Sequence, residues 1–146
     1  MRFQWLQMRI SEEKDRRQRE AQILERLPRA LEELHRGLTA CLEGYTAAFG
    51  PEAGDLQLHA SRIRVTVREE QDGKWEQRAR IEVTISTSLP GFKIERGAPS
   101  GPEPLMIEVG LLPGDKIFYR DGDQYLTMEE LTRRILDRAF FPKLGE

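Results

Sequence analysis

The clearest pattern in the chain is a stripe of apolar residues that recur three or four positions apart between Leu24 and Ala48. That spacing keeps the side chains on one side of an α-helix. Pro28 lies within the stripe, and a proline removes one backbone donor and clashes with the preceding turn. Because the stripe keeps its phase across Pro28, we expect one long helix with a kink there, ended by Gly50-Pro51. The stripe consists of Leu24, Leu27, Leu31, Leu34, Leu38, Cys41, Tyr45 and Ala48.

The residues before this stripe have no continuous apolar face. Ser11 is a suitable helix N-cap, and nearly every side chain from 11 to 20 is polar. Residues 3–10 include Phe3, Trp5, Met8 and Ile10, and so short a segment fits either a strand or a helical lead-in. We therefore expect residues 1–20 to project from the domain or to be partly ordered.

Strict alternation of apolar and polar residues predicts a β-hairpin at 62–68 and 74–85, on either side of Asp72-Gly73. A two-residue loop would pair Val67 with Arg78 and mix the two faces of the sheet. A three-residue loop starting at Gln71 pairs Val67 with Gln77 instead, and is the preferred register. Leu56 and Leu58 are out of phase with the next strand, which predicts a bulge or bend near Ser61.

The C-terminal half predicts further strands and a last helix. Strands are expected at 105–111 and 117–119, with short pieces near 92–94 and 125–126 and a loop at 97–104. Thr127 and Glu130 have the spacing of a capping box, so the last helix should start there and end before Pro142.

This order of elements predicts one α+β domain over residues 1–146. A long N-terminal helix, kinked near Pro28, would pack on a curved antiparallel sheet of 4–5 strands, with a C-terminal helix beside it. In architecture alone this resembles cystatin-like and nuclear-transport-factor-like folds, and the sequence contains no motif of either family.

The composition of the chain bears on its cellular compartment and on the classes of partner it could bind. The formal net charge is -2, so no strong overall field attracts nucleic acid or membranes. No segment approaches the ~20 apolar residues that a membrane span needs. Cys41 is the one cysteine, so no disulfide forms within the chain, and we expect a cytoplasmic protein.

No catalytic, cofactor-binding or metal-binding motif is found. His35 and His59 are not spaced as metal ligands, and Cys41 lies on the apolar stripe as an inert core residue would. Asp121-Gly122-Asp123 places glycine too early for a calcium loop. Five arginines (Arg62, Arg64, Arg68, Arg78 and Arg80) alternate along the hairpin, but Glu76 and Glu82 lie among them, which favours a solvated, ion-paired face over nucleic-acid binding.

Two functions follow as hypotheses. The first is a non-catalytic protein-binding or assembly module that self-associates or binds a partner through the long helix, with Leu24, Leu27, Leu31 and Leu34 as apolar anchors. The alternative is a small-molecule-binding protein or enzyme with a pocket between helix and sheet. The mouth of that pocket would be formed by His59, Tyr119, Asp121 and Asp123.

Overall fold

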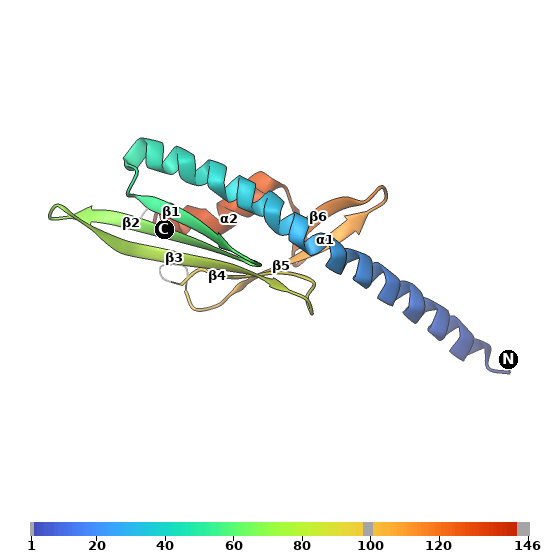
Figure 1. The fold of residues 1–146 in the computed structure, drawn as a ribbon. Coiled ribbons are helices and arrows are strands. Elements are labelled where there is room, and N and C mark those ends of the chain that lie inside the picture. The colour runs from blue at the N-terminus through green and yellow to red at the C-terminus, as the bar shows by residue number, and fades with distance from the viewer. Residues whose placement is uncertain (1, 98–100, 143–146) are drawn as a thin grey trace.

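The computed structural model describes residues 2–97 and 101–142 and has the expected α+β architecture (Figure 1). A long helix, α1 (Gln4–Phe49), is followed by an antiparallel sheet and a shorter helix, α2 (Met128–Phe140). Both helices lie on the same face of the sheet, which we call the helix face; the other is the open face. The predicted combination of long N-terminal helix, antiparallel sheet and C-terminal helix is confirmed.

The sheet has seven strands, so the predicted number of 4–5 was too low. Each strand pairs antiparallel with the next one in the sequence, which leaves β1 and β7 at the two edges. The shortest strands have three, five and six residues, too few for alternation to identify them with certainty. The strands are β1 (Gly54–His59), β2 (Arg62–Gln71), β3 (Lys74–Ser86), β4 (Gly91–Glu95), β5 (Leu105–Leu112), β6 (Lys116–Asp121) and β7 (Gln124–Leu126).

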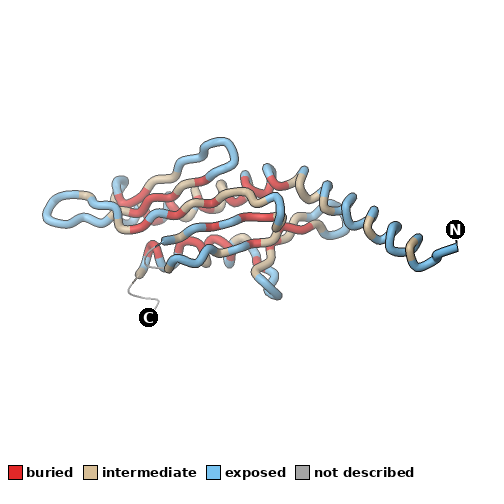
Figure 2. Tube along the Cα trace, turned by 90° about the horizontal axis from the view of Figure 1, so that it is seen from below, coloured by how far each residue is buried: buried red, intermediate tan, exposed pale blue. Residues whose placement is uncertain are grey.

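One apolar core lies between the helices and the helix face. It combines alternate strand residues, such as Val65 and Ile81, with Leu34 of α1 and Leu131 of α2, all fully buried. Apolar residues recur with the helical period in the helices and at every second position in the strands, so each element has one apolar side. Packing the helices on the sheet buries all of these sides together. Figure 2 shows the buried residues concentrated in the body and absent from the N-terminal end of the chain.

The long helix differs from the prediction in two ways. It begins at Gln4 rather than near Ser11, and Phe3, at the N-cap, makes no side-chain capping hydrogen bond. It also continues as a helix through Pro28, and the predicted kink is not shown. Pro28 is exposed, so the carbonyl that loses its backbone donor lies on the solvent side, where water satisfies it.

The β2–β3 hairpin has the two-residue turn that the sequence analysis rejected. Asp72 and Gly73 both have positive φ, as a type I′ turn requires, and Gln71 pairs with Lys74. The faces do not mix, because the register shifts between Val67 and Arg68: Val67 pairs with Ala79 and Arg68 with Gln77. The predicted Val67–Gln77 pairing is therefore wrong, and Arg78 is the extra residue of a β-bulge.

Of the predicted bulge or bend near Ser61, the structure has a tight turn at Ala60-Ser61 and no bulge. His59 pairs with Arg62 across the two-residue turn Ala60-Ser61, and Leu58 pairs with Ile63. A two-residue turn puts directly paired residues on one face, so Leu56 and Leu58 share the helix face with β2 without any irregularity.

The second helix begins as predicted. The Thr127 hydroxyl accepts a hydrogen bond from the Glu130 amide, and the Glu130 carboxylate accepts one from the Thr127 amide. These bonds satisfy backbone donors that the first turn of a helix leaves free. The bonds that the Thr127 amide and hydroxyl donate to the Glu130 carboxylate lower the pKa of Glu130. The capping box is therefore confirmed.

Candidate interaction surface

The N-terminal part of α1, residues 4–22, extends beyond the body of the molecule (Figures 1 and 2). We call this segment the arm. None of its residues is buried, whereas Ile23 and Leu24 already pack against the core. At ~1.5 Å of rise per residue, the arm is roughly 28 Å long. An isolated helix of this length is marginal in water, and most helices in proteins are stabilised by a packed apolar face.

The end of the arm, which we call the tip, carries large apolar side chains in solvent. Exposed fractions are 58% for Phe3, 66% for Trp5, 64% for Met8 and 41% for Ile10. Exposed apolar residues are common singly, but a group of four at the end of an extended element indicates an interaction site. The sequence analysis noted these residues without assigning them a role.

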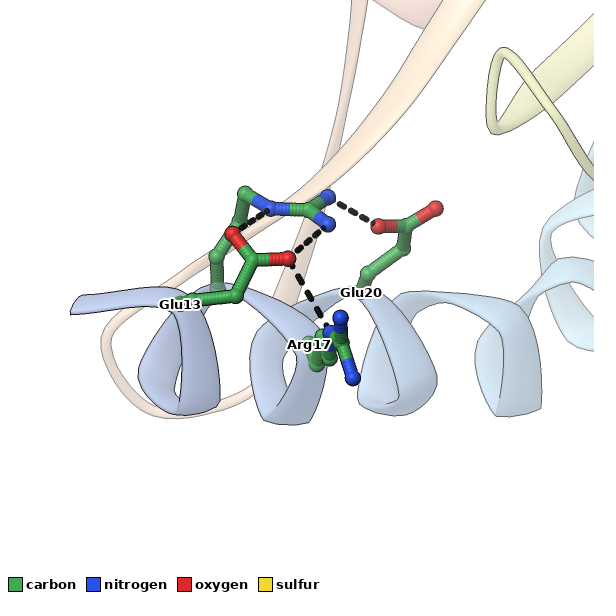
Figure 3. Close-up of polar contacts among 4 residues, drawn as sticks. Glu13, Arg17 and Glu20 are labelled. Atoms are coloured by element: carbon green, nitrogen blue, oxygen red, sulfur yellow. Dashed lines mark hydrogen bonds and ion pairs between the residues drawn. The ribbon is translucent and has the colours of Figure 1, made fainter. Parts of the chain in front are cut away.

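Between the tip and the body, the arm is stabilised by ion pairs along its own surface (Figure 3). Arg16 contacts Glu13 at 2.6 Å and Glu20 at 2.6 Å, and the Arg17 Nε donates to Glu13 at 3.0 Å. The hydrogen bonds from Arg16 and then Arg17 lower the pKa of Glu13 to about 2. Pairs three or four residues apart stabilise a helix only modestly, so this segment is a solvated stem between the tip and the body.

Comparison with protein-family models, with curated proteins and with solved structures found no match to this chain. Among the described residues, no helix is both long enough and apolar enough to cross a membrane.

The four leucines predicted as partner anchors divide into two groups. Leu27, Leu31 and Leu34 are buried in the chain's own core, so they offer almost no surface to a partner. Leu24 is partly exposed at the junction between arm and body. The stripe packs on the sheet, which was one of its two possible uses.

The four residues predicted to form a pocket mouth do not come together. His59 ends β1 at one edge of the sheet, whereas Tyr119, Asp121 and Asp123 lie on β6 and in the β6–β7 turn near the other edge. Asp121 pairs with Arg134 of α2 at 2.6 Å, and Asp123 is exposed. Strand order decides this separation, and hydrophobic alternation does not reveal strand order.

Tyr119 instead connects the sheet to α1. Its side chain is buried, and its hydroxyl donates to Glu33 Oε2 at 2.9 Å. Burial, followed by this contact with Glu33, raises the pKa of Tyr119 above its ordinary value. The phenol stays protonated, and its hydrogen bond to the Glu33 carboxylate holds β6 against α1.

The arginines of the hairpin serve different purposes. On the open face, Arg64 and Arg80 both contact Glu82, at 3.1 Å and 2.9 Å, and Arg68 pairs with Asp55. These pairs account for the charges without a ligand. Arg78, displaced by the bulge, instead donates to the carbonyl oxygens of Ala139 and Phe140 at 2.7 Å and 2.9 Å, and thereby holds the end of α2.

A groove of about 450 Å³ separates the last turns of α1 from α2. Tyr45 and Phe140 stack at its base with ring centroids 4.1 Å apart, and Phe49 and Phe141 stand exposed at one end. Cys41 packs against the core, as a residue of the stripe should, and its partly exposed side lines the groove. The aromatic residues of this groove come from the C-terminal ends of α1 and α2, which sequence periodicity does not bring together.

Proposed function

We propose that this chain is a non-catalytic protein-binding module whose arm inserts its apolar tip into a cleft of a partner protein. The supporting observation is the exposure of Phe3, Trp5, Met8 and Ile10 at the end of a helix that the body does not cover. The body, with its apolar core, would serve as the platform from which the arm extends.

The residue types suit this role. Burying a large apolar side chain contributes roughly 1.5–3 kcal/mol, so a cleft that encloses all four side chains would bind the tip with useful strength. Tryptophan and methionine are enriched at protein interfaces, and a single buried tryptophan is often the dominant contact. Because the arm is already helical, less ordering entropy is lost on binding than for an unfolded segment.

The proposal predicts site-specific capture that depends on Trp5. A photoreactive amino acid is placed at Met8 in the full chain, and at exposed Glu76 of the body in a second version. In the cell of origin, we expect a discrete adduct from position 8 and none of the same size from position 76. Trp5→Glu should remove that adduct because it replaces the largest exposed apolar side chain of the tip by a charged one.

Gln7→Glu is the matched control, since it adds the same charge to an exposed polar position of the arm. It should retain most of the adduct. The proposal is wrong if positions 8 and 76 give the same products, or if Trp5→Glu leaves the adduct from position 8 unchanged.

A further inference from the structure

The edge strand β1 lacks the usual protections against pairing with another chain. It has six residues, Gly-Asp-Leu-Gln-Leu-His, with no proline, no lysine and an unbroken register to β2. Natural edge strands are usually interrupted or charged to prevent edge-to-edge association. The opposite edge, β7, has three residues and is protected by its short length.

The backbone of β1 has groups available for a further strand. His59 and Arg62 flank a two-residue turn and form backbone hydrogen bonds to each other. Every second residue of β1, counted back from His59, therefore also forms backbone hydrogen bonds to β2. The bond from the Arg68 amide to the Ala53 carbonyl, 2.8 Å, continues the same alternation. The amides and carbonyls of Leu56 and Leu58 therefore point away from β2, toward the free edge.

The sequence of β1 is complementary to itself when it is reversed about Gln57. In an antiparallel pair centred there, Leu56 lies opposite Leu58 of the second copy, and Asp55 lies opposite His59 of the second copy. Cross-strand apolar pairs and hydrogen-bonded polar pairs both stabilise a sheet. We propose that two copies of this chain associate through β1, antiparallel and on a twofold axis at Gln57, which joins their sheets into one.

The two faces of β1 suit this arrangement. Leu56 and Leu58 pair with the buried residues Val65 and Ile63, so they lie on the helix face, and the two copies would gather four leucines around the axis. Leu58 is 46% exposed in the single chain and gains most from this cover. Asp55 lies on the open face, where its side chain keeps 40% of its surface beside Arg68 and has room to accept from a histidine.

Helix α1 leaves space for the second copy. Burial decreases along β1, from buried Gly54 to exposed His59, so α1 covers only the first end of the strand. At Gly54 the approach is close, because a Cβ there would lie 2.8 Å from Leu42 Cδ1. Twofold pairing places the covered end of each strand beside the open end of the other, which keeps the two α1 helices apart.

This interface is small beside the ~1,600 Å² of a standard protein–protein interface, so we expect a weak dimer that depends on concentration. Sedimentation of the full chain at concentrations from ~1 to ~500 μM should show a reversible monomer–dimer equilibrium. The dissociation constant of the dimer should be micromolar or weaker. Monomer throughout this range would overturn the proposal.

Two substitutions at exposed His59 test the register. His59→Asp puts like charges opposite each other at Asp55 and should weaken association about tenfold or more, whereas His59→Arg puts a cation opposite Asp55 and should retain it. Leu58→Lys should abolish it, and Leu112→Lys, at a similarly exposed leucine of β5, should not. Circular dichroism and thermal melting of each variant establish that the fold is intact.

This inference does not depend on the arm. If Trp5→Glu abolishes association while Leu58→Lys leaves it unchanged, the chains associate through their tips and the β1 proposal is wrong. If Leu58→Lys abolishes association and Trp5→Glu does not, the β1 proposal is supported, whether or not the arm binds a partner protein.

Discussion

Arg78→Met is expected to lower the free energy of unfolding by about 2–4 kcal/mol. The Arg78 guanidinium donates to the carbonyl oxygens of Ala139 and Phe140 and to the Tyr45 hydroxyl, at 2.7 Å, 2.9 Å and 3.1 Å. The last carbonyls of a helix have no donor within the helix, so methionine would leave them unpaired near the core. A cation at this end also complements the helix dipole.

Urea unfolding followed by circular dichroism measures the change. Arg80→Met is the matched control, because Arg80 is on the same strand but contacts Glu82 on the open face. An exposed pair of this kind contributes roughly 0–1 kcal/mol. Equal, small losses for both variants would show that Arg78 does not hold α2 in solution.

Leu31→Ala is expected to cost about 2–5 kcal/mol, because it removes a side chain that is 4% exposed and leaves a cavity between α1 and the sheet. The measurement is again the free energy of unfolding in urea. Leu24→Ala, at the partly exposed start of the same stripe, should cost clearly less. A loss below about 1 kcal/mol for Leu31→Ala would contradict its place in the core.

Local patterns predicted the elements of this fold well. The stripe from Leu24 to Tyr45, the alternation around Asp72-Gly73 and the spacing of Thr127 and Glu130 each involve neighbours in sequence, and the structure confirms the helices, the hairpin and the cap. These signals depend on the fixed periods of helix and strand, which a single sequence displays directly.

The errors arose where a distant contact decides between local alternatives. The two-residue turn at Asp72-Gly73 was rejected because it placed Arg78 opposite Val67. A bulge removes that conflict, and Arg78 then reaches carbonyl oxygens 61 and 62 positions further along the chain. Nothing near Arg78 in the sequence indicates those acceptors.

The candidate site was predictable in part. The polar composition of residues 11–20 led to the expectation that this segment buries no face, and none of its residues is buried in the structure. Residues 3–10 were too few for periodicity to decide between a strand and a helical lead-in. In α1, Trp5 and Met8 are three residues apart and lie on one side of the helix, whereas Ile10 lies on another. Their exposure depends on α1 continuing past the body, which only the packing of the whole chain determines.

Amide hydrogen exchange along α1, at a concentration where the chain is monomeric, tests the central claim that one continuous helix is half core and half free arm. We predict strong protection for residues 27–45 and fast exchange for residues 4–22, since a helix without packed neighbours opens easily. Equal protection of the two segments would mean that the body covers the arm, and rapid exchange over 27–45 would contradict the shared core itself.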